Sequence, residues 1–133
     1  MKPDKLEQLA QWYVLAAGAL DFSTGLGLVW APPPVLALMR VTEPETEALI
    51  YLRWVGAFVA AVGFVYLWAY YRAERALLRA MLELTIWFRL AAGGFAAWAI
   101  ATGHLPRGWL SVPLTDAALA VVQIWLLRRG VFR

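Results

Sequence analysis

The sequence contains no cysteine and a single histidine, His104. Without cysteine the chain cannot form disulfides, carry out thiol redox chemistry or hold a cysteine-ligated metal cluster. One histidine cannot supply a bis-histidine haem site or a histidine-rich metal site within one chain, and His104 lacks the co-ligands that a metal needs. The Gly25-Leu26-Gly27 stretch is not a phosphate-binding loop, because no strand precedes it. We therefore expect neither a metal nor a cofactor.

Charged residues are also scarce. Asp, Glu, Lys and Arg make up 16% of the 133 residues, whereas hydrophobic residues make up 62%. A chain of this size has too much surface for its volume to hide so many apolar side chains in a water-soluble core. The lipid bilayer is therefore the expected partner. The net charge of +3 comes from basic residues between the apolar stretches rather than from a basic patch with exposed aromatics, so we do not expect nucleic acid as a partner.

Four stretches are apolar and long enough to cross a bilayer as helices, which takes ~20 residues. They cover about residues 9–30, 49–71, 80–102 and 110–127. Short connections between antiparallel neighbours are typical of an up-down-up-down bundle. The sequence therefore predicts an all-α fold, a polytopic four-transmembrane-helix bundle that forms a single domain over residues 1–133.

Turn residues predict where the helices begin and end. The prolines of Pro32–Pro34 end the first helix, because they remove donors and clash with a continuing helix, and a short interfacial turn over 35–39 follows. Thr42 and Glu45 have the spacing of a capping box, which predicts the start of the second helix. A tight turn is expected over 72–75, although this stretch contains neither glycine nor proline.

Lysine and arginine predict the orientation, because cytoplasmic loops of membrane proteins carry an excess of them. The termini and the central loop hold most of these residues: Lys2, Lys5, Arg72, Arg75, Arg79, Arg128, Arg129 and Arg133. The other two loops hold only Arg40 and Arg107. We therefore expect both termini and the central loop to face the cytoplasm.

Four charged residues interrupt the apolar stretches: Asp21, Arg53, Arg89 and Asp116. Each shares its helix face with small residues, which mark close helix packing in membranes, so the four charges should point into the bundle. At a rise of ~1.5 Å per residue, Asp21 and Arg89 fall near the bilayer midplane and the other two in its outer half. This predicts the pairs Asp21–Arg89 and Asp116–Arg53, although Arg89 is long enough to reach either acid. Two acids and two bases cancel, as a dry interior requires.

Two interpretations of this charge network stay open. It can fix the register of the helices, or it can form a site for a ligand, an ion or a proton, since charges inside a membrane often mark function. Asp116 also has a simpler explanation, because a carboxylate in the first turn of a helix complements the helix dipole. Glu83 is expected to pair with Arg79, one turn earlier. The aromatic residues of the middle two helices are expected to face lipid, although a minority could line a ligand cleft: Tyr66, Trp68, Tyr70, Tyr71, Trp87 and Trp98.

A set of motifs is spread along the chain. The first helix ends in Gly25-Leu26-Gly27-Leu28-Val29-Trp30-Ala31-Pro32, the second carries Leu52-Arg53-Trp54-Val55-Gly56-Ala57, the third carries Arg89 and the short fourth carries Asp116. This layout resembles the small bacterial four-helix membrane proteins called DoxX-like. The resemblance implies the same four-helix fold and a place in the bacterial inner membrane. Some members are similar to subunits of quinone-linked respiratory oxidoreductases, but no quinone-site residue maps onto this sequence.

Three classes of function follow from these observations. The neutral network and the missing catalytic groups favour a non-enzymatic protein, either an accessory subunit of a membrane complex or a binder of a lipid-like or quinone-like molecule. The alternative is a small proton- or ion-coupled transporter or channel that uses Asp21 or Asp116 and forms a homodimer to build its pathway. A tight arginine partner would, however, hold such an acid ionised. An enzyme using Asp21, Glu83 or Asp116 ranks last, because no nucleophile–base pair, metal cluster or cofactor motif accompanies them.

Overall fold

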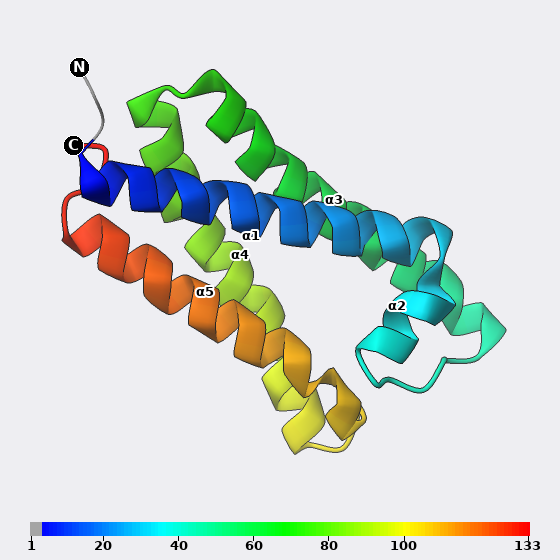
Figure 1. Cartoon of the computed structure of the whole chain (residues 1–133). Coiled ribbons are helices and arrows are strands. Elements are labelled where there is room, and N and C mark those ends of the chain that lie inside the picture. Colours follow the sequence, from blue (N-terminus) through cyan, green and yellow to red (C-terminus); the bar gives the residue numbers. More distant parts are fainter. Residues whose placement is uncertain (1–3) are drawn as a thin grey trace.

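The computed structural model describes residues 4–133, so the predicted contribution of Lys2 to the orientation lies outside the described residues. The fold is all-α. Its elements in chain order are α1 (Lys5–Trp30), α2 (Pro32–Leu38), α3 (Thr46–Arg72), α4 (Arg75–Ala101), the short 3-10 helix η1 (Arg107–Leu110) and α5 (Ser111–Arg128) (Figure 1). Four segments are long and apolar enough to cross a membrane: α1, α3, α4 and the run from η1 through α5. The prediction of an all-α chain with four such helices is confirmed.

The first helix begins earlier than expected, at Lys5 rather than near Leu9. Asp4 is its N-cap and accepts a hydrogen bond from the backbone N–H of Glu7 at 2.7 Å, which satisfies one of the free donors of the first turn. The prolines stop α1 as predicted, but they also start α2. The N–H groups of a first helical turn have no helical partner, so proline, which lacks an N–H, loses no hydrogen bond there. A short helix therefore replaces the expected turn over 35–39.

The predicted capping box before α3 is wrong. α3 begins at Thr46 with Glu45 as N-cap, and no side chain makes a capping hydrogen bond there. The tight turn between α3 and α4 is present and depends on Ala73, which ends α3 in the left-handed conformation with a φ of 53°. Its N–H donates to the carbonyl of Ala69 at 3.0 Å, and α4 begins at Arg75.

The helices pack as two pairs, α1 along α3 and α4 along α5. Figure 1 shows the start of α1, the C-terminus and the α3–α4 turn at one end of the molecule, and α2 and η1 toward the other. Glycines bring the first pair together: Gly25 faces the backbone of Ala60, and Gly63 faces the backbone of Phe22. A β-carbon on either glycine would overlap the opposite backbone. The prediction that small residues mark close helix packing is therefore confirmed for α1 and α3.

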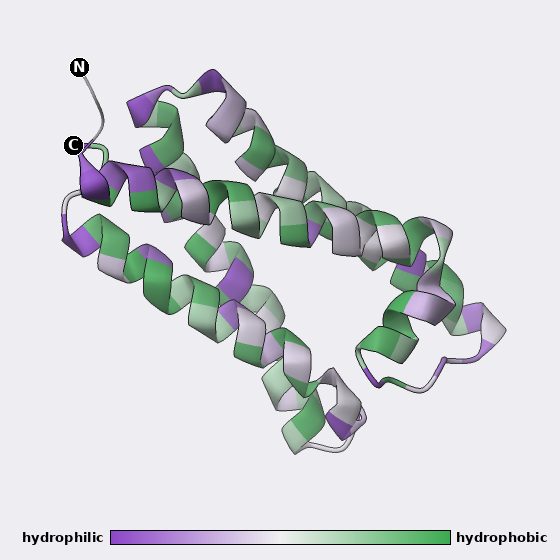
Figure 2. Cartoon of the chain, viewed as in Figure 1, coloured by the Kyte–Doolittle hydropathy of each residue, from purple (hydrophilic) through white to green (hydrophobic). Residues whose placement is uncertain are grey.

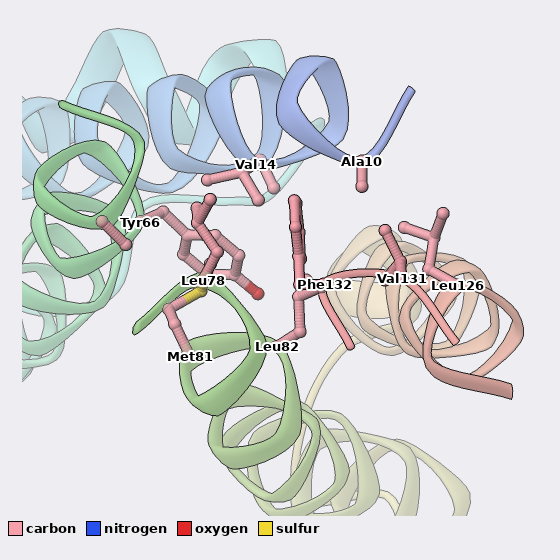
Figure 3. Packing of buried hydrophobic residues seen from close by; sticks show 11 residues of the cluster. Ala10, Val14, Tyr66, Leu78, Met81, Leu82, Leu126, Val131 and Phe132 are labelled. Carbon is pink, nitrogen blue, oxygen red and sulfur yellow. The ribbon is translucent and has the colours of Figure 1, made fainter. Parts of the chain in front are cut away.

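Contacts at three levels join the two pairs. Near the chain termini, a cluster of buried apolar residues includes Phe132, which lies between Val14 of α1 and Leu82 of α4 (Figure 3). In the middle, polar side chains from all four long helices meet. At the opposite end, the carbonyl oxygen of Arg40 lies against Gly108. The apolar cluster consists of Ala10, Val14, Ala17, Tyr66, Ala69, Leu78, Met81, Leu82, Leu126, Val131 and Phe132.

The outer surface is largely apolar. Only 17–28% of the most apolar window of each spanning segment is buried inside the protein. Large side chains such as Trp54, Phe58 and Trp87 are 63%, 63% and 69% exposed. Figure 2 shows hydrophobic residues along the length of the helices and hydrophilic ones mainly at their ends. Apolar surface of this extent belongs in hydrocarbon, so the chain is a membrane protein in contact with lipid.

Candidate functional site

Arg89, in the middle of α4, is the centre of an ion network that joins three helices. Its Nη2 donates to Oδ2 of Asp21 on α1 at 2.9 Å, and its Nη1 donates to Oδ1 of Asp116 on α5 at 3.0 Å. The side chain of Arg89 is 5% exposed, that of Asp21 15% and that of Asp116 16%. A charge this far from water persists only with close, hydrogen-bonded partners. The predicted pair Asp21–Arg89 is confirmed.

Neutral polar side chains complete the surroundings of Arg89. Tyr66 of α3 accepts a hydrogen bond from Nη2, and Gln123 of α5 accepts one from Nε, each at 3.1 Å. Tyr66 donates to Thr85 at 2.9 Å, and Gln123 donates to Thr85 at 2.6 Å and to the carbonyl of Leu82 at 3.0 Å. Among residues 4–133, every fully buried polar side-chain atom has a hydrogen-bond partner. The network therefore connects all four long helices.

The environment of Tyr66 differs from the one predicted. Tyr66 was expected to face lipid, but it is fully buried at 0% exposure. The other five aromatic residues of that group are exposed, by 38–80%. Tyr66 lies three residues after Gly63, so the small-residue face of α3 points to it. Thr85 lies four residues before Arg89, and Gln123 lies seven residues after Asp116. Helical periodicity therefore places Thr85 on the face of Arg89 and Gln123 on the face of Asp116.

Arg53 lies outside the network. Its Nη1 donates to the carbonyl of Val29 near the end of α1. The predicted pairing of Asp116 with Arg53 is therefore wrong, because Asp116 bonds to Arg89 instead. The last carbonyls of a helix have no helical partner and favour a positive charge, so Arg53 fastens α3 to the end of α1. Two carboxylates thus share one guanidinium, in place of the neutral set of four that the sequence suggests.

Two smaller expectations have opposite outcomes. Asp116 lies in the second turn of α5, which begins at Ser111, so the first-turn dipole explanation does not apply to it. The pair of Arg79 and Glu83 is confirmed, with 2.9 Å between Nη2 and Oε1. Both side chains are partly exposed, at 30% and 49%, which makes this a surface pair.

A groove of about 230 Å³ lies between α4 and α5, beside the Arg89–Asp116 pair. These two residues supply its polar part, and the other lining residues are apolar: Leu90, Gly93, Gly94, Ala97, Pro113 and Ala117. No atom lies within 4 Å of the place that a β-carbon would occupy on Gly94. A β-carbon on Gly93 would instead stand 2.9 Å from the Cβ of Asp116. The groove therefore joins apolar walls to one carboxylate and one guanidinium.

Two other kinds of site come into question for the described residues, a metal site and a site at His104. Within residues 4–133, no group of three or more His, Asp or Glu side chains is placed to hold a metal ion. His104 stacks on the ring of Trp98, with 5.4 Å between the ring centroids.

No protein-family model, curated protein or solved structure matches this chain. The DoxX-like resemblance therefore rests on the order of the motifs alone. What the fold establishes is a small membrane protein with four helices of spanning length and a buried network of Arg89 with Asp21 and Asp116.

Proposed function

We propose that the protein binds a small hydrophobic molecule, of a lipid-like or quinone-like kind, in the groove between α4 and α5. The observation that carries this proposal is the groove itself, about 230 Å³ in volume, with apolar walls and the Arg89–Asp116 pair in its lining. Ligand sites are typically apolar hollows in which a few polar groups orient the ligand. A ligand that enters from the bilayer would lay its apolar part along the walls and its polar head against the ion pair.

Ligand-induced stabilisation of the purified full chain in an uncharged detergent tests this proposal. The probes are a short-chain benzoquinone, a short-chain phospholipid and alkyl amphiphiles with neutral, cationic or anionic heads. A ligand at 100 times its Kd stabilises the folded state by about 2.7 kcal/mol. We expect at least one of these probes to raise the melting temperature of the wild type.

Two variants of α4 show whether the groove is the site. Gly94→Leu places a side chain in the open space at Gly94, so it should abolish the stabilisation by the probe. Ala91→Leu adds the same side chain at an exposed position outside the groove, and it should respond like the wild type. No stabilisation of the wild type by any probe, or equal stabilisation of Gly94→Leu, would contradict the proposal.

A second candidate function is proton- or ion-coupled transport by a homodimer. The observation that favours it is the ratio of two carboxylates to one guanidinium, because either Asp21 or Asp116 can take up a proton while the other keeps Arg89 paired. A liposome flux assay tests this function. The wild type should show flux, and Asp21→Asn and Asp116→Asn should lower it. No flux in any of the three proteins would remove this candidate.

We further propose that the protein lies in a bacterial inner membrane with both termini in the cytoplasm, either alone or as an accessory subunit of a membrane complex. The lysines and arginines at the start of α1, in the α3–α4 turn and after the end of α5 support this orientation, because these parts of the chain lie at one end of the molecule (Figure 1). Because the chain has no cysteine, single cysteines can report accessibility without background labelling. An impermeant thiol reagent added to intact cells should label Glu43→Cys and leave Ala76→Cys unlabelled. The reverse pattern would contradict the orientation.

A further inference from the structure

The ion network lacks one positive charge. Asp21 and Asp116 both bond to Arg89, and no other cation among residues 4–133 forms an ion pair with either carboxylate. Arg53, which the sequence suggests as the second base, bonds to the carbonyl of Val29 instead. With both carboxylates ionised, the three side chains carry a net charge of −1, and a site within a bilayer favours neutrality.

Each carboxylate also keeps one oxygen free of hydrogen bonds within the described chain. Asp116 accepts from Arg89 through Oδ1 and Asp21 through Oδ2, which leaves Oδ2 of Asp116 and Oδ1 of Asp21 without a donor. Neither free oxygen is fully buried, because every fully buried polar side-chain atom has a partner. Oδ2 of Asp116 lies 3.4 Å from the place that a β-carbon would occupy on Gly93, which lines the groove.

We propose that the ligand of this groove is a small amphipathic organic cation, whose ammonium head lies against Asp116 and whose apolar part lies along α4 and α5. This inference rests on the proposed function and names the charge of its ligand. A cation supplies the missing positive charge and meets the free carboxylate oxygen, whereas an anionic head would add to the negative charge. The apolar lining residues, such as Leu90, Ala97 and Pro113, take the hydrocarbon part.

The other groups around Asp116 do not supply this charge. From α4, Arg89 already divides its charge between two carboxylates. From α3, Tyr66 donates its hydroxyl hydrogen to Thr85. From α1, Asp21 is itself an acid, and Tyr13 donates its hydroxyl hydrogen to the carbonyl of Leu119. A proton is the natural competitor for the same position, so cation binding should weaken as the pH falls.

Calorimetric titration of the full chain in an uncharged detergent tests the inference with three probes that share one alkyl chain: decyltrimethylammonium, decanol and decyl sulfate. We expect the cation to bind with a Kd at least about tenfold lower than that of the alcohol, and the sulfate not to bind. Asp116→Asn keeps an oxygen that can accept the Arg89 bond, and it should weaken binding of the cation about tenfold, which is more than it weakens binding of the alcohol. Lower pH should weaken binding of the cation to the wild type but not to Asp116→Asn.

The outcomes separate this inference from the proposed function. Equal affinity for the cation and the alcohol, or an Asp116→Asn variant that keeps the wild-type affinity for the cation, would overturn the inference and leave a neutral ligand in the groove. Binding of benzoquinone or phospholipid without binding of the cation would have the same meaning. If none of the probes binds, both the inference and the proposed function are wrong. If Asp116→Asn fails to fold, the two α4 variants still locate the site, because Gly94→Leu should lose cation binding and Ala91→Leu should keep it. The comparison of the three probes on the wild type then decides whether the ligand is a cation.

Discussion

Asp116 lies so close to Gly93 that a β-carbon on the glycine would stand 2.9 Å from the Cβ of the aspartate. Gly93→Ala should therefore displace Asp116 from Arg89 and lower the free energy of unfolding by about 1–3 kcal/mol. The adjacent Gly94 is the matched control, because a β-carbon there meets nothing within 4 Å. Gly94→Ala should be neutral or raise stability by up to about 1 kcal/mol, since alanine is the better helix former. Unfolding titrations with SDS in mixed micelles measure the stability of both variants. Equal changes for Gly93→Ala and Gly94→Ala would contradict the close contact between Gly93 and Asp116.

The hydroxyl of Tyr66 connects α3 to the ion network, since it accepts from Arg89 and donates to Thr85. Tyr66→Phe keeps the ring in place and removes both bonds, so we expect a loss of about 1 kcal/mol in the free energy of unfolding. Tyr71, on the same helix, is 80% exposed, and Tyr71→Phe should change the stability little. The same unfolding titration compares the two variants. A Tyr66→Phe protein as stable as the wild type would show that this hydroxyl contributes nothing.

Ala73 occupies a left-handed conformation, with a φ of 53°, in the turn between α3 and α4. This conformation costs an L-residue roughly 1–2 kcal/mol and costs glycine almost nothing. Ala73→Gly should therefore raise the free energy of unfolding by about 1 kcal/mol. Ala80→Gly, at an exposed position within α4, should lower it by about 1 kcal/mol. Thermal melts show whether the two substitutions have these opposite signs, and a shared sign would contradict the assignment of the turn.

Phe132 is 4% exposed and belongs to the apolar cluster near the termini, although it lies beyond the last helix. The segment that carries it is also held by polar contacts: Arg75 donates to the carbonyl of Arg133 at 2.8 Å, and Arg79 donates to that of Val131 at 3.4 Å. Phe132→Ala should lower the free energy of unfolding by about 3 kcal/mol. Phe88→Ala removes a ring that is 58% exposed and should cost much less in detergent. Similar losses for the two variants would mean that Phe132 is not part of the core.

Composition and length were enough to predict the number of long helices. Hydrocarbon tolerates only long apolar segments whose backbone groups bond internally, so four such stretches mean four helices. The prolines at 32–34 ended α1 as predicted. The capping box at Thr42 is not formed, and α3 begins at Thr46 instead.

The sequence by itself determined that Asp21 and Arg89 lie on small-residue faces at similar depth, and this was sufficient to pair them. The tertiary structure alone decided that Asp116 joins Arg89 and that Arg53 bonds to the end of α1. The physical reason is the solvent. In water, an apolar stripe reveals the buried face of a helix, but lipid is as apolar as the protein interior, so hydropathy does not mark that face. Which face is buried, and hence which acid each arginine reaches, depends on how the helix pairs rotate against each other.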